Sequence, residues 1–543
     1  MKGLFKKAKA ELQSILDIDP RTNQPPAQPS QHQHQQGFRR GIEMDQPSTI
    51  KPVTPLDIIR YRYHHGTNLG SVYVLERWLR NSMFPEDASG SSELEAVKAW
   101  VEKIGVDETR KKFEEFWANA VTDEDIKWLV QEARATSIRL PIGYYDLLPS
   151  CLENTPFAPY SAVYTSAWSS ISSLVMRLRM HGIGTLLDLH ALPGGANTQD
   201  HSGTNSGVAD LWVSQDDRNL GIRCCQFLAQ QVVEGLDGVI GIQIANECEW
   251  GSPMNPWYND CIDAISAIDA SIPVIISDGW NLENAINYSL IKNTAMPSQP
   301  TCPVVVDTHY YWAHTGEDTS KSPQQIINEA STKLSELNGK EGSIIDRGAA
   351  QVVVGEYSCV LSEDSWSKRG DTPKQVLVKE FGEAQSRRWQ QRSGGSFFWT
   401  WKMDWFPGGE WGFQEQTSSS AVTSPPSYST PSSSISALLD RSNSHRDERM
   451  YAAVNQHTSY WDHLVPNTPC EHWRYENGWK VGYKDAQDFF QGASTVGGGN
   501  KIGNLEIWVL KRVRESGMRG NFVWEFEQGL RRGIHDLYAA VGI

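Results

Sequence analysis

Mostly apolar segments of six to eight residues alternate with longer amphipathic segments through the middle of the chain. The short segments lie at 64–69, 136–142, 183–190, 239–246, 273–278, 303–309, 351–356 and 396–401. Segments with helical spacing of apolar residues include 123–135, 161–181, 217–234, 257–270, 324–337 and 374–392. Nearly continuous apolar strands are typical of a parallel sheet buried on both faces. Eight of them separated by helices predict an α/β fold, a (β/α)8 TIM barrel.

A doubly wound open sheet is the alternative fold. Its nucleotide-binding versions carry Gly-x-Gly-x-x-Gly or Gly-x-x-x-x-Gly-Lys-Ser/Thr directly after a strand. Neither motif follows any predicted strand, so the barrel is favoured.

Two low-complexity segments lie on either side of the periodic region. Residues 21–37 are rich in Gln, Pro and His and indicate a flexible linker, while 417–435 are rich in Ser, Thr and Pro. Residues 449–464 have helical spacing, and we interpret them as the last barrel helix. We therefore expect a barrel over 46–464, with 417–435 as an insertion in it.

The two ends of the chain are predicted to lie outside the barrel. Residues 1–45 combine an amphipathic helix with the linker, and 465–543 form a helical extension. The N-terminal helix lacks the apolar core of a secretory signal. We favour a docked helix or a frayed end, with peripheral membrane contact as the alternative. Tryptophans at helical spacing in the extension favour packing on the barrel over a sugar-binding module.

Composition argues against several classes of protein. The formal net charge of −15 argues against a nucleic-acid partner. No apolar run approaches the ~20 residues of a membrane span. The eight cysteines are scattered, without a Cys-x-x-Cys pair, which predicts buried free thiols. Free thiols together with the lack of a secretory signal predict a cytoplasmic protein.

Chemically useful residues stand where the predicted strands end. In a barrel these ends converge on one face, where active sites are built, so we expect the residues to meet there. They are Arg139, His190, Asn246, Glu247, His309, Tyr311, Glu356, Trp399 and Trp401.

Glu247 and Glu356 follow the fourth and seventh strands. Two facing carboxylates suggest glycoside hydrolysis, in which one carboxyl group donates a proton and the other attacks the anomeric carbon. Their surroundings must then push their pKa values apart. The rival chemistry is metal-assisted hydrolysis, with His190 and His309 joining the two glutamates as ligands. It needs a tighter cluster, and His-Glu-x-x-His is absent, so we predict no metal and no cofactor.

Seven motifs over about residues 60–413 resemble, in order, those of glycoside hydrolase family 5, most closely its fungal exo-β-1,3-glucanase group. They are GTNLGSVYVLERWL (66–79), ATSIRLPIGYY (135–145), DLHALPGGANTQDHSG (188–203), IANE (244–247), DTHYY (307–311), VVGEYS (353–358) and FFWTWK (397–402).

The resemblance implies a role for each matched residue. Glu247 matches the general acid/base and Glu356 the nucleophile of a retaining mechanism. The other matched residues would support the nucleophile (Arg139), contact the sugar (His190, Asn246), flank the carboxylates (His309, Tyr311), form a platform under the sugar (Trp399) and hold its outer hydroxyls (Glu76, Asp200). Trp401 lies on the same strand face as Trp399 and competes with it for the platform role.

Departures from the family pattern bear on the substrate. Cys248 follows the catalytic Asn-Glu pair where the family has Pro, and Arg77 replaces another Pro. Gln199 and His314 stand where the exoglucanases clamp the next sugar between two Phe rings.

We therefore expect a retaining exo-acting β-glucosidase of the intracellular branch, whose substrate is a carbohydrate or other β-glucoside. A β-glucoside is better supported than β-1,3-glucan itself. One alternative is a β-glucosidase for glucosylated lipids or sterols. A non-catalytic sugar-binding barrel is the other, although it would normally lose a carboxylate, and both remain.

Overall fold

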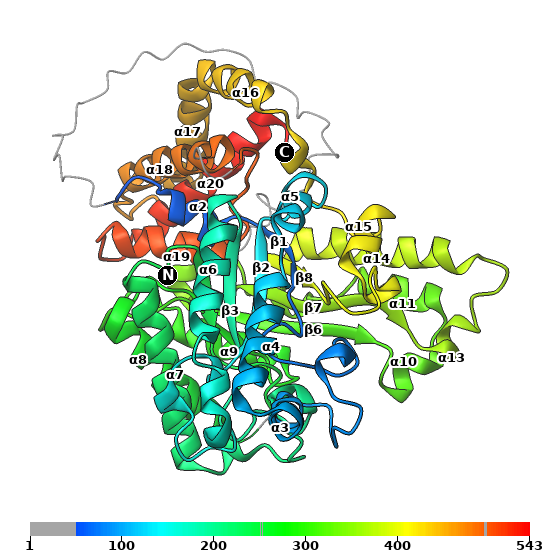
Figure 1. The fold of residues 1–543 in the computed structure, drawn as a ribbon. Helices are drawn as coiled ribbons and strands as arrows, with labels where there is room; N and C mark the ends of the chain where they lie inside the picture. The colour runs from blue at the N-terminus through cyan, green and yellow to red at the C-terminus, as the bar shows by residue number, and fades with distance from the viewer. Residues whose placement is uncertain (1–49, 250, 252, 493–496) are drawn as a thin grey trace.

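The computed structural model describes residues 50–249, 251, 253–492 and 497–543. The predicted N-terminal helix and linker lie outside the described residues. Eight parallel strands close a barrel in chain order, with β8 pairing back to β1, so the predicted (β/α)8 barrel is confirmed (Figure 1). The strands are β1 His64–Asn68, β2 Ser137–Gly143, β3 Gly184–Ala191, β4 Val239–Gln243, β5 Val274–Ser277, β6 Val304–Trp312, β7 Val352–Leu361 and β8 Gly395–Phe398.

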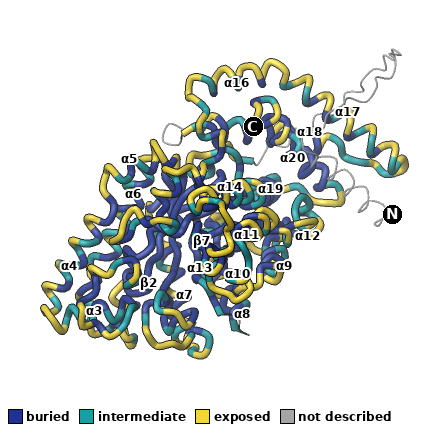
Figure 2. Tube along the Cα trace, turned by 90° about the vertical axis from the view of Figure 1, so that its right-hand side faces the viewer, coloured by how far each residue is buried: buried dark blue, intermediate teal, exposed yellow. Residues whose placement is uncertain are grey.

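Helices surround the barrel and cover the strands. The longer ones are α3 Glu93–Ile104, α4 Val106–Asn119, α5 Asp123–Gln131, α6 Ala167–Met180, α7 Gln215–Val233, α8 Met254–Asp269, α9 Leu282–Lys292, α11 Pro323–Ala330 and α14 Lys374–Arg392. Shorter helices are α2 Pro55–Tyr61, α10 Gly316–Ser320, α12 Ile344–Arg347, α13 Glu363–Trp366 and α15 Phe413–Ser418. Figure 2 shows the strands as the buried centre, with exposed residues on the outer helices.

Local sequence signals explain several helix boundaries. Thr122 and Asp125 form a reciprocal capping box at the start of α5, and Ser322 and Gln325 do the same for α11. The helix predicted over 324–337 ends earlier, at Ala330, because Leu334 adopts a left-handed backbone with φ of 62°.

Five helices form the C-terminal region: α16 Ser432–Ser444, α17 Arg446–Leu464, α18 His472–Gln491, α19 Leu505–Glu515 and α20 Val523–Val541. The backbones of α18 and α20 approach closely at glycines of both helices. A Cβ added to Gly478 would lie 2.1 Å from the Phe526 carbonyl oxygen, and one added to Gly529 would lie 2.0 Å from that of Tyr475. The C-terminal region packs against apolar side chains near the strands' amino ends, including those of Ile240, Ile275, Val353 and Phe397. The carboxyl ends of the strands therefore remain available for a site.

Helix α17 differs from the sequence-based expectation of a final barrel helix. Its buried residues Met450, Ala453, His457 and Trp461 repeat at helical spacing, and the helix packs on α18 and α20. It thus belongs with the extension. Periodicity identified its apolar face but carried no information on which element covers that face.

Other composition-based expectations were also met. All eight cysteines are free, and seven are buried. Four tail tryptophans, Trp461, Trp479, Trp508 and Trp524, are buried, while Trp473 is exposed. Among the described residues, no helix combines the length and apolar character needed to cross a membrane.

Candidate active site

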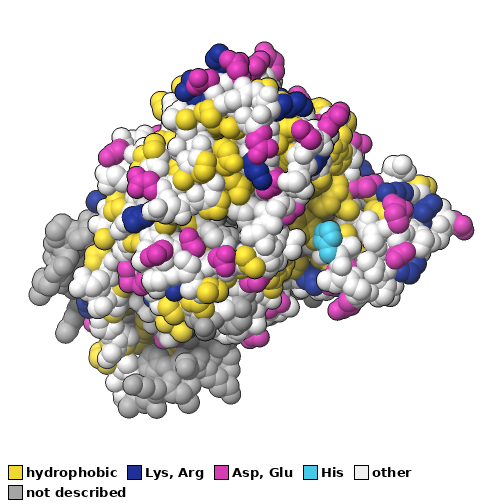
Figure 3. All heavy atoms as spheres, turned by 60° about the horizontal axis from the view of Figure 1, so that its bottom comes forward, with side chains coloured by type: hydrophobic (Ala, Val, Ile, Leu, Met, Phe, Trp, Pro, Cys, Tyr) yellow, Lys and Arg dark blue, Asp and Glu magenta, His cyan; other side chains and the backbone are white. Residues whose placement is uncertain are grey.

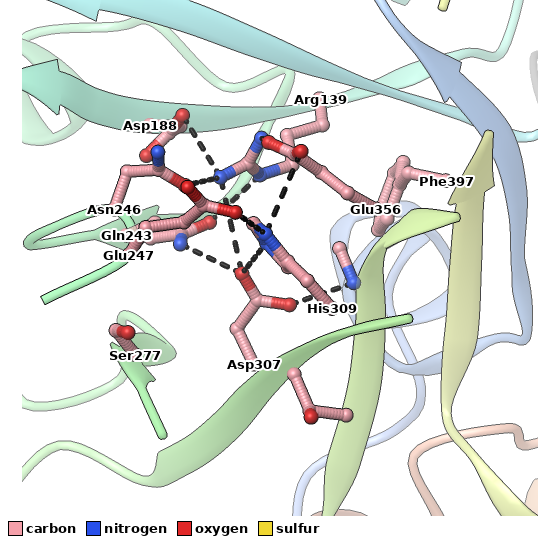
Figure 4. Close-up of polar contacts among 12 residues, drawn as sticks. Arg139, Asp188, Gln243, Asn246, Glu247, Ser277, Asp307, His309, Glu356 and Phe397 are labelled. Atoms are coloured by element: carbon pink, nitrogen blue, oxygen red, sulfur yellow. Dashed lines mark hydrogen bonds and ion pairs between the residues drawn. The ribbon is translucent and has the colours of Figure 1, made fainter. Parts of the chain in front are cut away.

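The strand ends bring a polar network together around Arg139 of β2 (Figure 4). Its guanidinium is fully buried and donates to Glu356 Oε1 at 2.9 Å and to Asn246 Oδ1 at 2.7 Å. A third contact of 3.0 Å reaches Asp188 Oδ2. Burial disfavours the charged guanidinium, but Asp188, Glu356 and Asp307 outweigh it and raise the pKa of Arg139. Arg139 therefore stays positively charged and fixes one oxygen of Glu356.

Tyr311 of β6 fixes the other oxygen of Glu356. Its hydroxyl donates to Glu356 Oε2 at 2.7 Å. Burial and the neighbouring carboxylate raise the pKa of Tyr311 well above its usual value, so the phenol keeps its proton at neutral pH. With Arg139 on one oxygen and Tyr311 on the other, the Glu356 carboxylate is held in one orientation at the cavity.

Glu247 follows β4 in a backbone conformation that non-glycine residues rarely adopt, with φ of 43°. Its Oε1 lies 2.8 Å from His309 Nδ1, and its Oε2 lies 3.3 Å from His201 Nε2. Burial raises the pKa of Glu247, but the hydrogen bonds from the two histidines outweigh burial and hold that pKa well below its usual value. The strained turn thus places the carboxylate between two imidazoles.

The pKa values of the two histidines are raised, whereas that of Glu247 is lowered. Burial lowers the pKa of His201, but the hydrogen bond and charge of Glu247 outweigh it and raise that pKa to about 9. The pKa of His309 is likewise raised well above its usual value, because burial is outweighed by the carboxylates of Glu356 and Asp307. His309 also contacts Asp307 Oδ2 through Nε2 at 3.0 Å. At neutral pH both imidazoles are therefore protonated beside an ionised Glu247.

These groups border a cavity of about 610 Å³. Its lining residues are Glu76, Trp78, His190, Asn197, Thr198, Gln199, His201, Asn246, Glu247, Glu249, Trp280, Tyr311, His314, Glu356, Trp399 and Trp411. Figure 3 brings forward the side of the molecule opposite the C-terminal helices, where hydrophobic side chains gather around a hollow. Polar groups and indole rings thus face the same space, a combination suited to a sugar, which presents hydroxyls at its rim and an apolar face.

Trp399 and Trp401 occupy different environments, although both follow β8. The Trp399 ring lies parallel to His190, with an angle of 10° and 5.9 Å between centroids, and lines the cavity. Trp401 stacks on Trp128 in the core at 5.9 Å. The cavity platform is therefore Trp399.

Comparisons with known proteins identify the family of this chain. The model of the cellulase family, glycosyl hydrolase family 5, matches residues 98–404. The chain belongs to glycosyl hydrolase family 5. The model of the glucan 1,3-beta-glucosidase 3 C-terminal domain matches residues 442–541 of this glycosyl hydrolase.

Two fungal proteins are similar over most of the chain. Glucan 1,3-beta-glucosidase 3 of Schizosaccharomyces pombe is 32% identical, covering 87% of this chain and 95% of that protein. An uncharacterized glycosyl hydrolase of Saccharomyces cerevisiae is 28% identical over 90% of this chain and 94% of its own length. The structure of a rutinosidase from Aspergillus niger matches with a TM-score of 0.51 and 16% identity, covering 68% of this chain and 99% of that one, a likeness in fold alone.

Seven of the ten predicted site residues of this glycosyl hydrolase line the cavity: Glu76, His190, Asn246, Glu247, Tyr311, Glu356 and Trp399. Arg139 and His309 lie behind the lining and hold the two glutamates. Asp200 lies outside the cavity lining. Its Oδ1 accepts a hydrogen bond from Asn205 Nδ2 at 2.7 Å, and its Oδ2 accepts one from the Ser91 hydroxyl. Its contact with the sugar stays a prediction.

Several site residues were missed. Asp188 and Asp307 are buried carboxylates that hold His190 and His309 at 2.7 and 3.0 Å. Each lies two residues before its histidine, so strand alternation places it on the same face and was a usable signal. His201 directly follows Asp200 in a matched motif, but loop residues have no periodicity to reveal where they point.

Trp280 was also missed. It follows β5 with φ of 61°, lines the cavity and remains 62% exposed. Its backbone N–H donates to Asp278 Oδ1 at 2.9 Å, and Asp278 Oδ2 accepts from Thr308 at 2.7 Å. This anchored turn holds a large apolar ring at the cavity mouth, as expected for a surface that meets a ligand.

Proposed function

We propose that this glycosyl hydrolase is a retaining, exo-acting β-glucosidase that releases terminal β-linked glucose. The observation that carries the retaining mechanism is the spacing of the carboxylates. One oxygen of Glu247 and one of Glu356 lie within 4.8 Å of each other. Retaining enzymes space the two carboxyl groups by about 5–5.5 Å, whereas inverting enzymes need roughly 6.5–9.5 Å to admit a water molecule.

In this mechanism, Glu356 attacks the anomeric carbon while Glu247 protonates the departing oxygen. The bond to the leaving group breaks and a glucosyl ester forms on Glu356. Glu247 then takes a proton from water, which attacks the same carbon and releases glucose with its original configuration. Arg139 and Tyr311 hold the attacking carboxylate, and Trp399 supports the sugar ring from below.

His201 holds the proton that the first step requires. In the free enzyme, His201 carries it 3.3 Å from Glu247 Oε2, since the pKa of His201 is raised to about 9. The leaving-group oxygen carries no proton and can only accept one, so at Oε2 it requires the protonated form of Glu247. Transfer of the His201 proton to Glu247 produces the neutral acid that the reaction needs, without uptake from solvent.

Exo action on glucose is supported by a carboxylate in the cavity wall. Glu76 lines it beside Trp78, whose indole donates to Glu76 Oε2 at 2.8 Å. A carboxylate at this place accepts hydrogen bonds from outer hydroxyls of a terminal sugar, which fixes the identity of that sugar. Relatives named glucan 1,3-beta-glucosidase are consistent with a β-linked glucose substrate.

A β-glucosidase for glucosylated lipids or sterols is the second candidate. Exposed apolar rings favour it: Trp78 and Trp280 line the cavity, and Trp405 lies against Trp78 with 6.2 Å between ring centroids. These rings offer an apolar surface to a leaving group, where Gln199 and His314 supply no aromatic clamp for a second sugar. We also propose a cytoplasmic location, supported by the eight free thiols.

A substrate screen distinguishes the two candidates. Laminari-oligosaccharides, glucosylceramide and a steryl glucoside are each incubated with wild type, Glu356→Ala and the surface control Glu380→Gln. We expect glucose release by wild type and by Glu380→Gln, and none by Glu356→Ala. Preference for the oligosaccharides supports a glucan substrate, and preference for either lipid supports the second candidate. Inactivity of the wild type on every β-glucoside would refute both.

A further inference from the structure

A second cluster of ionisable side chains lies in the C-terminal region, away from the catalytic cavity. His457 comes from the middle of α17, His472 is the first residue of α18, and Glu525 lies in the first turn of α20. His457 and Glu525 are buried, and His472 is half-buried. The mechanism proposed for the barrel uses none of the three.

The three side chains converge on one point. Glu525 Oε2 lies 2.9 Å from His472 Nδ1 and 3.0 Å from His457 Nε2. One donor atom from each residue lies within 4.8 Å of those of the other two. In a tetrahedral site with ligands about 2.0–2.2 Å from Zn²⁺, neighbouring ligand atoms are about 3.3 Å apart. Outward movement of a few tenths of an ångström would therefore admit the ion.

The surrounding groups match those of a metal site. His472 Nε2 lies 3.0 Å from Asp462 Oδ1, the carboxylate–histidine arrangement that orients a metal-binding imidazole. The backbone N–H of Glu471 donates to Glu525 Oε1 at 2.7 Å and leaves Oε2 for the cluster.

The three side chains meet at a single carboxylate oxygen. Both imidazoles direct a nitrogen at Glu525 Oε2. We propose that His457, His472 and Glu525 bind a divalent transition-metal ion, with Zn²⁺ best suited to two imidazoles and one carboxylate, and with water at the fourth position. An ion at this point would link helices α17, α18 and α20.

Zinc binding by the full-length protein tests this proposal. After dialysis against a chelator, ZnCl₂ is titrated in competition with a chromophoric indicator, and thermal unfolding is followed with and without the ion. The wild type should bind one equivalent at this site and unfold at a higher temperature with Zn²⁺. Glu525→Gln should weaken binding by more than the roughly 10–100-fold that loss of an outer-sphere partner costs, and should abolish the thermal shift.

Further variants show whether zinc binding depends on this cluster. His472→Asn changes a half-buried helix terminus and supplies a second test if Glu525→Gln fails to fold. His463→Ala removes an exposed histidine of the same helix α17 and should bind like wild type. Glu356→Gln alters the catalytic carboxylates, where Glu247, His309 and Glu356 also lie close together, and should leave this stoichiometry unchanged. Absence of binding by folded wild type, or equal binding by wild type and both cluster variants, would overturn the proposal.

Discussion

At the scale of single residues, the site depends on matched pairs of charge in a buried space. Arg139 compensates several carboxylates at once, and His201 and His309 compensate Glu247. A cationic side chain thus lies within hydrogen-bonding distance of Asp188, Glu356 and Glu247. Removing one partner therefore leaves a buried charge without compensation. Depending on which partner is lost, the effect is on the stability of the protein or on the pH dependence of its activity.

Arg139→Met should destabilise the protein. It leaves Asp188 and Glu356 buried without their guanidinium, and loss of one partner of a buried ion pair costs about 3–5 kcal/mol. Urea unfolding monitored by tryptophan fluorescence measures the effect, with Arg441→Met at an exposed position as the control. A loss below about 1 kcal/mol would mean that Arg139 does not compensate these carboxylates.

His201→Asn should move the alkaline limb of the pH profile of kcat/KM to lower pH. In the wild type the shared proton is lost when His201 titrates, at a pKa of about 9. In the variant that proton resides on Glu247 alone, beside protonated His309, which lowers the carboxyl pKa, so the proton leaves at lower pH. Rates on a nitrophenyl β-glucoside from pH 5 to 10 give the profile. An unchanged alkaline limb would show that His201 does not store the proton.

The loss of activity in Glu247→Ala should depend on the leaving group of the substrate. General acid assistance is worth about 10²–10⁴-fold, and an activated aryl leaving group needs little of it. We expect a loss of this size on alkyl β-glucosides and a much smaller loss of the first step on a dinitrophenyl β-glucoside. Equal losses on both substrates would contradict the assigned role of Glu247.

At the scale of elements, strands were easier to predict than loops. Most strands follow apolar runs because they are buried on both faces, although β1 (His64–Asn68) is buried with polar side chains. The residues at the strand ends then meet by topology alone. Glu247 and Glu356 could thus be paired across the barrel from the sequence. His201 and Trp280 lie in loops whose conformation depends on contacts, and α17 was assigned to the barrel because periodicity does not identify a helix's partner.

The close contact between α18 and α20 leads to a prediction about the stability of the protein. Gly478→Ala places a Cβ 2.1 Å from a backbone oxygen of α20, which must move, so we expect a cost of about 1–3 kcal/mol and a lower melting temperature. Gly316→Ala is the matched control, because its Cβ would meet no described atom within 4 Å. Identical melting of the two variants would show that the helices do not pack this closely.

At the scale of the whole molecule, the two ends of the barrel have different tasks. The carboxyl ends of the strands carry the catalytic residues, while the C-terminal helices bury the apolar side chains at the other end. The extension is thus part of the barrel's support. The sequence predicted a helical extension after the barrel, but only the packing of these helices explains why they accompany the barrel.

Removing the C-terminal helices should therefore prevent the barrel from folding stably. A chain that ends at residue 431 lacks α16 to α20 and exposes Ile240, Ile275, Val353 and Phe397, an apolar surface that favours aggregation. Solubility, circular dichroism and glucosidase activity are compared with those of the full chain. A soluble, folded and fully active truncated protein would show that the extension is dispensable.

The central claim is that Glu247 and Glu356 hydrolyse β-glucosides with retention of configuration. The most direct test is proton NMR of the first-formed glucose during hydrolysis of an aryl β-glucoside, before the anomers interconvert. The spacing of the two carboxylates predicts that β-glucose appears first and that the α-anomer grows in only by mutarotation. Initial formation of α-glucose would contradict the account.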